Sequence, residues 1–101
     1  MDRLSPWYRV LELRSVERRK RALAAIRVIG DARAARAVSR LTYSPEPDLR
    51  RAAAETLGEL GGLVAVTHLL RHLQDPDPGV RRTVADALER TGWQPRTPGE
   101  Q

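Results

Sequence analysis

Apolar residues recur along the chain at helical spacing, and glycines interrupt this pattern at a constant distance. Gly30, Gly61 and Gly92 stand 31 residues apart, and each follows a stretch whose apolar side chains fall three or four positions apart. A residue without Cβ readily takes the left-handed conformation that closes a helix. We therefore expect three similar units, each with a helix that ends at one of these glycines.

The turns before these helices repeat in the same register. Residues 45–48 read Pro-Glu-Pro-Asp, and residues 76–79 read Pro-Asp-Pro-Gly. Asp77 before Pro78 is a strong helix-start signal, because the carboxylate accepts free backbone N–H groups and proline suits the first helical turn. Glu46 and Ser15 occupy the equivalent capping positions. A period of this length indicates stacked helical units, none of which can bury its apolar face alone.

The pattern predicts about six helices in two and a half repeats. An N-terminal capping helix is expected in residues 1–15, and full repeats in 16–46 and 47–77. A partial repeat in 78–93 has no second helix, and residues 94–101 are expected to be a disordered tail because they have no apolar periodicity. The fold class is therefore all-α, a short solenoid of antiparallel helix pairs.

Each predicted helix has an apolar stripe assigned to the core. The expected core residues are Ala22, Ala25, Ile26 and Ile29 of a helix at 16–29, Ala34, Ala35, Val38 and Leu41 of a helix at 32–42, Ala53, Thr56, Leu57 and Leu60, then Ala65, Val66, Leu69, Leu70 and Leu73, and finally Val84, Ala87 and Leu88. Arg18 stands where the later repeats have Leu49 and Val80. The first helix of repeat one is therefore expected to pack differently.

A series of cations keeps the same period. Arg19, Arg50 and Arg81 are 31 residues apart, and each is followed by a second Lys or Arg. Cations near a helix N-terminus oppose the helix dipole, so their recurrence points to acidic partners nearby. We expect Asp–Arg pairing between repeats, and we rank it above ligand binding by a row of cations that could follow a phosphate backbone.

The residues of these units resemble a known repeat family. Residues 49–61 and 80–88, joined through the Asp-Pro-Asp-Pro run at 75–78, are similar to the short HEAT-like repeat named for phycobilisome (bilin) lyases. The resemblance covers residues 16–93. It implies a right-handed stack of helix pairs, usually used to bind proteins. Some relatives attach or remove bilin chromophores, but the motif carries no catalytic signature that transfers to a residue here.

Composition narrows the function classes. The 101 residues fit one domain, and the absence of cysteine excludes disulfides, thiol nucleophiles and cysteine metal ligands. No apolar run is long enough to cross a bilayer, so we expect a cytoplasmic protein with no membrane contact. The net charge of +5 is uneven. Residues 1–43 hold eleven cations and four anions, and residues 44–101 hold seven and nine, which suggests an acidic partner.

Two pairs of residues have side chains that can bind a metal or act as acid and base. His68 and His72 are one helical turn apart, but two ligands do not complete a metal site. Glu55 and Glu59 fall on the side opposite the apolar stripe, where Glu55 can pair with Arg51. We therefore expect no enzyme activity, no catalytic residue, no metal and no cofactor.

The sequence predicts a non-catalytic protein–protein interaction scaffold. The partner would be another protein with an acidic surface, docked on the second helices through Arg33, Arg36, Arg40, Thr67, His68 and Arg71. Two alternatives stay open: a subunit or chaperone in bilin attachment to phycobiliproteins, and nucleic-acid binding through the basic N-terminal half. Because repeat three has no second helix, either Trp93 folds back over helix 78–91 or a further subunit covers it, as in a homo-oligomer.

Overall fold

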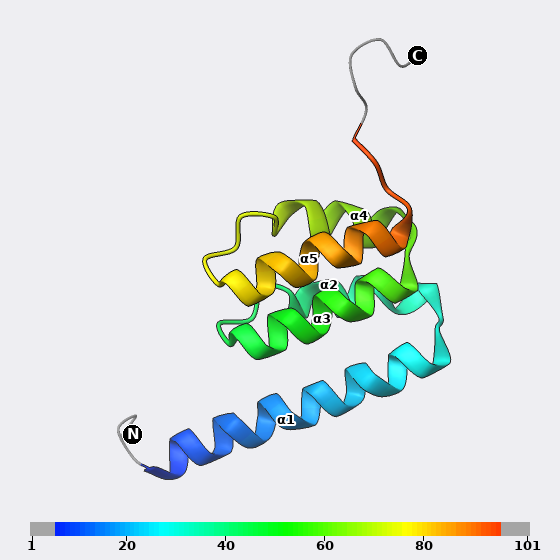
Figure 1. The fold of residues 1–101 in the computed structure, drawn as a ribbon. Helices are drawn as coiled ribbons and strands as arrows, with labels where there is room; N and C mark the ends of the chain where they lie inside the picture. Colours follow the sequence, from blue (N-terminus) through cyan, green and yellow to red (C-terminus); the bar gives the residue numbers. More distant parts are fainter. Residues whose placement is uncertain (1–5, 96–101) are drawn as a thin grey trace.

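The computed structural model describes residues 6–95, with side chains from Arg14 onward, and this part of the chain is helical without any strand. Figure 1 shows the order of the helices. Their bounds are α1 Pro6–Ile29, a 3-10 turn η1 Ala32–Ala34, α2 Ala35–Leu41, α3 Pro47–Leu60, α4 Gly62–Arg71 and α5 Pro78–Thr91. No helix in the described residues is both long and apolar enough to span a membrane.

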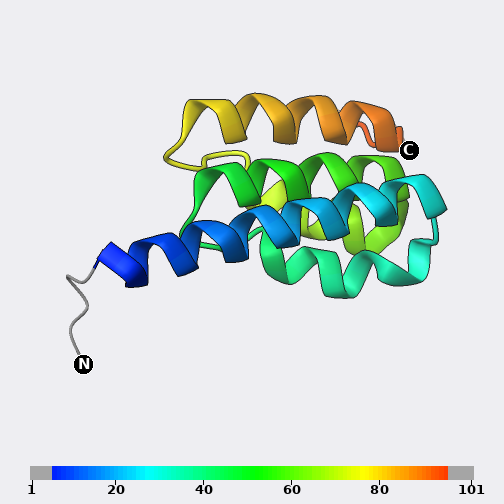
Figure 2. The same ribbon diagram turned by 90° about the horizontal axis from the view of Figure 1, so that it is seen from below.

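The helices form two layers. The first helix of each repeat belongs to one layer, in which α1, α3 and α5 lie side by side (Figure 1). The second helices, α2 and α4, form the other layer behind α3 and α5 (Figure 2). We call these the first-helix layer and the second-helix layer. This arrangement confirms the predicted all-α solenoid.

The three periodic glycines each lie directly after the first helix of a repeat. Gly30, Gly61 and Gly92 have φ angles of 70°, 69° and 82°, in the region that side chains with Cβ disfavour. The Gly61 N–H donates to the Leu57 carbonyl at 2.9 Å and closes the last turn of α3. The prediction that these glycines end the helices is confirmed.

The core of repeats two and three follows the predicted stripes except at Leu73, which lies past the end of α4 and is 40% exposed. Leu57 and Val84 are fully buried, and Leu88 is nearly so. At the start of α5, the carboxylate of Asp77 accepts the backbone N–H of Val80 at 2.9 Å, as the capping signal predicted. Burial of such aliphatic side chains is worth roughly 1.5–3 kcal/mol each and supplies most of the attraction between repeats.

The N-terminal region differs from the prediction in its helix boundaries. The expected capping helix and the first helix of repeat one are a single helix, α1, so the described chain contains five α-helices rather than six. Ser15 lies inside α1 and not at its start. Neither glycine nor proline occurs between Leu11 and Val16, so nothing in the local sequence breaks the helix there. The ends of the expected cap and tail, residues 1–5 and 96–101, lie outside the described residues.

The face that α1 turns to the core also differs. Among its described side chains, Leu23 is buried and Ile26 is half-buried, whereas Ala22 and Ala25 are exposed and Ile29 is 74% exposed. Arg18, at the position of the buried Leu49 and Val80, explains the change. A charged side chain in that place would be costly to bury, and α1 packs on α3 through another side instead.

Candidate functional site

Ion pairs connect the helices of the first-helix layer. Arg27 of α1 donates to Glu55 at 3.2 Å and to Glu59 at 3.1 Å, and Arg90 of α5 reaches the same Glu59 at 3.2 Å. The hydrogen bond from Arg27 lowers the pKa of Glu59, and the charges of Arg27 and Arg90 act in the same direction. The two glutamates therefore join α1, α3 and α5. The expected Arg51–Glu55 pair is wrong, since Arg51 pairs with Asp48 at 3.0 Å.

The most buried ion pair lies at the turn between repeats two and three. Arg50 donates from Nε and Nη2 to the two carboxylate oxygens of Asp75, at 2.9 and 3.0 Å, and the Asp75 side chain is 3% exposed. Burial alone would raise the pKa of Asp75. Hydrogen bonds from Arg50 and from the Asp77 backbone N–H outweigh burial and hold the pKa below its usual value. Asp75 therefore fixes this turn as a carboxylate.

Two of the three periodic arginines, Arg50 and Arg81, thus have local structural partners, although not those expected. The Arg50–Asp75 pair lies within repeat two, so the predicted Asp–Arg pairing between repeats is wrong in detail. The link to repeat three is made by Arg81, whose Nη1 donates to the Asp75 carbonyl at 2.7 Å. Arg19 is exposed and forms no hydrogen bond within the described residues.

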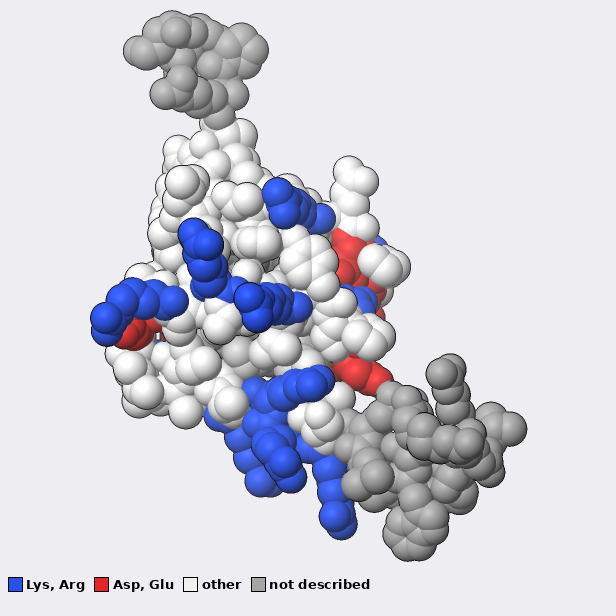
Figure 3. Space-filling model, turned by 180° about the vertical axis from the view of Figure 1, so that it is seen from behind, with Lys and Arg blue, Asp and Glu red and all other residues white. Residues whose placement is uncertain are grey.

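The second-helix layer has a different charge. Neither α2 nor α4 contains an acidic residue. Figure 3 views this side of the molecule: Lys and Arg lie across it and over α1 below, and Asp and Glu appear at its edges. We define the basic face as the six residues predicted for partner binding on α2, α4 and the preceding turn η1: Arg33, Arg36, Arg40, Thr67, His68 and Arg71.

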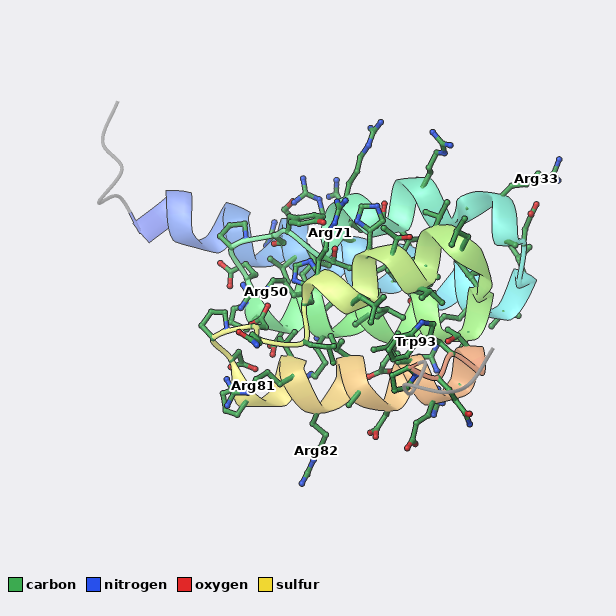
Figure 4. The ribbon with its side chains drawn as sticks, turned by 90° about the horizontal axis from the view of Figure 1, so that it is seen from above. Arg33, Arg50, Arg71, Arg81, Arg82 and Trp93 are labelled. Atoms are coloured by element: carbon green, nitrogen blue, oxygen red, sulfur yellow. The ribbon has the colours of Figure 1, made fainter. Side chains whose placement is uncertain are left out.

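The structure brings most of these predicted residues to the same surface. Arg36, Arg40 and Arg71 are exposed and form no ion pair within the described residues. Arg33 lies at the far end, where it points away from the helices (Figure 4) and pairs with Asp31 at 2.8 Å. Thr67 is half-buried, and its hydroxyl donates to the Leu63 carbonyl at 2.8 Å. Thr67 is therefore the least available of the six to a partner.

An aromatic residue that sequence reasoning missed lies on this surface. Tyr43 is 51% exposed, and its hydroxyl is 3.0 Å from Nδ1 of His68. Its ring centroid is 4.7 Å from that of His72. Tyr43 follows α2 by two residues, and its equivalent in repeat two is Gln74. The helical period carries little signal for this position, because only the packing of α2 against α4 brings Tyr43 to the histidines.

His72 is enclosed by this cluster and stays neutral near pH 7. Its side chain is 11% exposed, and Nδ1 is 3.6 Å from a carboxylate oxygen of Asp75. Burial lowers the pKa of His72 more than the nearby carboxylate raises it. Its Nε2 is buried without a hydrogen-bond partner in the described part of the chain. This position aligns with the half-buried Leu41, so His72 acts mainly as a packing residue.

Clusters of metal-binding side chains are absent from the described residues. No group of three or more His, Cys, Asp or Glu side chains within residues 6–95 could hold a metal ion. A hollow of about 550 Å³ lies beside α5 and is lined mainly by apolar residues, with Glu89 and Gln94. None of the six residues of the basic face lines it.

Comparison with known proteins gives one match. The sequence profile of the family described as HEAT repeats matches residues 5–89, which is most of the chain. No curated protein matches the sequence. The match covers both layers, including α2 and α4 with the basic face.

Proposed function

We propose, since the chain belongs to the HEAT-repeat family, that it is a non-catalytic module that binds an acidic segment of another protein. Members of this family typically serve as scaffolds, and their repeats generally mediate protein–protein interaction. The proposal places that interaction on the basic face. The observation that carries it is the complete absence of acidic residues from α2 and α4.

Charge supports an acidic partner for this face. The exposed guanidinium groups of Arg36, Arg40 and Arg71 have no carboxylate partner within the described residues, whereas those of Arg27, Arg50 and Arg90 have one. Guanidinium groups bind carboxylates through two parallel hydrogen bonds. A segment rich in Asp or Glu would complete this arrangement, and the charge would also speed its association.

The aromatic cluster supports a protein partner over nucleic acid. Interfaces between proteins are enriched in Tyr and Arg, and Tyr43 contacts His68 of this face with its ring half exposed. Binding of single-stranded nucleic acid uses several stacking aromatics. The whole sequence has only four aromatic residues and no Phe. The bilin-attachment alternative rests on the repeat resemblance alone.

The test uses two variants with equal loss of charge. The face variant combines Arg36→Gln, Arg40→Gln and Arg71→Gln. The outer variant replaces three exposed arginines of α3 and α5, namely Arg51→Gln, Arg82→Gln and Arg90→Gln. Each full-length protein is immobilised and exposed to extract of its native cell, with and without nuclease treatment, at low and high salt. We expect wild type and the outer variant to retain the same proteins and the face variant to lose them.

Three results would overturn the proposal. One is equal retention by the face variant and wild type, and another is equal loss in both variants, which would reduce the effect to net charge. The third is a partner that disappears on nuclease treatment, which would make nucleic acid the ligand. Within the proposed interface, Tyr43→Ala is expected to weaken partner binding by about 2 kcal/mol, the scale of an interface hot spot.

A further inference from the structure

The end of the solenoid formed by α4 and α5 lacks the layer neighbour that covers the same positions one repeat earlier. In α2, Ala35, Ser39 and Thr42 are 3%, 4% and 2% exposed. Their equivalents in α4 and its following turn are Val66, Leu70 and Leu73, which are larger and more apolar. Val66 and Leu70 are only half-buried, and Leu73 is 40% exposed. Positions that a neighbouring helix buries in repeat one are thus partly exposed to solvent in repeat two.

One of these open positions, Leu73, lines a hollow along α5. It has a volume of about 550 Å³ and is lined by Leu73, Ala85, Leu88, Gly92 and Trp93, among others. Trp93 is half-buried beside the end of α5 (Figure 4) and packs against the core. It therefore folds back as expected, but it leaves the hollow unfilled. The second-helix layer would continue into this hollow if a third helix followed α2 and α4.

A pair of equivalent arginines indicates what should accompany such a helix. Arg50 donates from Nη1 to the Ser44 carbonyl at 2.9 Å and from Nε and Nη2 to Asp75, in the turn after α4. Arg81 donates from Nη1 to the carbonyl of Asp75, the residue equivalent to Ser44. Its Nε and Nη2 form no hydrogen bond within the described residues. Arg81 thus has the backbone carbonyl partner that Arg50 has, but not the carboxylate partner from the turn after a second helix.

We propose that this groove binds an amphipathic helix of a second protein that carries an Asp or Glu just past its C-terminal end. The helix would run antiparallel to α5, as α4 runs to α3, and its acid would pair with Arg81. A length of about three turns matches the 10 residues of α4. This site is separate from the basic face and does not depend on its function.

Two other occupants fit the observations less well. The residues directly after Gly92 place Pro95 and Pro98 at the third and sixth positions of the equivalent helix, and none of residues 94–101 is aliphatic or aromatic. A second copy that paired its own groove symmetrically would present another open groove rather than the single helix that continues the second-helix layer. A helix from a different protein supplies both the apolar stripe and the acid.

The test uses a peptide as the probe. A peptide with the sequence of residues 62–77 contains α4 and the turn with Asp75. It is titrated into the full-length protein with Trp7→Phe, which leaves Trp93 as the only tryptophan. We expect a saturable change in Trp93 fluorescence. A peptide with Asn in place of Asp75 should bind about tenfold more weakly, as expected for loss of a charge-assisted pair.

Variants of the protein identify the site. Arg81→Gln should weaken the acidic peptide by the same factor and should not weaken the Asn peptide further. Arg82→Gln is the matched control, since Arg82 points away from α4 (Figure 4) and its loss should change neither affinity. Leu73→Glu places a charge in the groove at a partly exposed position and should abolish binding while circular dichroism and thermal unfolding show a folded protein.

The outcomes that would overturn the proposal are distinct from those for the basic face. Absence of saturation at millimolar peptide, or equal affinity of the two peptides, would contradict it. Peptide binding that is insensitive to Arg81→Gln would indicate exchange with the protein's own α4. If sedimentation showed a dimer without peptide, and Leu73→Glu converted it to a monomer, the groove would be assigned to a second copy of the chain. The face variant, in contrast, should bind this peptide normally.

Discussion

The two helix layers differ in their ion pairs, although α1 and α5 of the first-helix layer also carry exposed arginines such as Arg19 and Arg82. In the first-helix layer and its turns, Arg27, Arg50 and Arg90 each contact a carboxylate, and the one at Asp75 is almost completely buried. In the second-helix layer, α2 and α4 hold exposed arginines and no acid. The comparison teaches that net charge alone does not locate a binding surface. What marks the surface is the separation of cations from anions.

The comparison predicts that removing an acid of the turns has the largest effect on stability. Asp75→Asn leaves the buried Arg50 without its carboxylate and should lower the free energy of unfolding by about 3–5 kcal/mol, measured by urea denaturation. Asp48→Asn is the control, because its pair with Arg51 is 64% and 46% exposed. That control should change stability by less than about 1 kcal/mol. An equal loss of stability in the two variants would mean that the contribution of an ion pair here does not depend on its burial.

Core truncation is expected to have the next largest effect. Leu57 is fully buried, and Leu57→Ala should cost about 2–5 kcal/mol through lost burial and the cavity that remains. Leu63 of α4 is 81% exposed, and Leu63→Ala should change stability by less than about 0.5 kcal/mol. Thermal unfolding of both variants checks this. An unchanged melting temperature for Leu57→Ala would show that the helix register is wrong.

The close approach of α3 and α5 gives a smaller but sharper test. A Cβ at Gly58 would lie 2.7 Å from Cβ and 2.8 Å from Cα of Ala87. Gly58→Ala should therefore lower stability by about 1–3 kcal/mol through overpacking, although alanine is the better helix former by up to about 1 kcal/mol. A higher melting temperature for this variant would show that α3 and α5 can move apart at Gly58 without loss of stability.

The histidine cluster predicts a pH dependence. Burial lowers the pKa of His72 below its unfolded value, so the folded protein resists its protonation. The contribution of neutral His72 is complete above about pH 6.5 and is lost as pH falls below that value, with a slope of at most about 1.4 kcal/mol per pH unit. The nearby groups that shape this response are Asp75, Arg50 and His68.

His72→Leu provides the control for this dependence, because leucine occupies the equivalent position 41. Urea denaturation at several pH values between 5 and 7 should give a flatter stability curve for the variant than for wild type. The same slope in both proteins would assign the dependence to another group. The Asp75 carboxylate should not contribute here, since its lowered pKa places its loss of stability in more acidic solution.

Sequence reasoning succeeded where one residue type had one structural meaning. The periodic glycines and the Asp77 cap determined where helices end and begin, and the stripes of repeats two and three determined the core. It failed where the neighbouring helices determine the role of a residue. Arg27, Gly58 and Glu89 share one position of the repeat, yet Arg27 bridges α1 to α3, Gly58 permits contact with α5, and Glu89 is exposed.

The candidate site divides in the same way. The basic residues of α2 and α4 could be placed on one surface from the alignment of repeats, because second helices of stacked units share one layer. The contribution of Tyr43 could not, since it has no equivalent in the next repeat and reaches the histidines only through packing. The pairing of Arg50 with Asp75 also depends on the path of the turn, which the helical period does not specify.

The division of roles between the layers can be measured by urea unfolding of two proteins. Arg50→Gln removes one positive charge, and the face variant removes three from Arg36, Arg40 and Arg71. We predict that Arg50→Gln lowers the free energy of unfolding by about 3–5 kcal/mol and that the face variant stays within about 0.5 kcal/mol of wild type. A face variant as unstable as Arg50→Gln would contradict the account, because those arginines would then be needed for the fold.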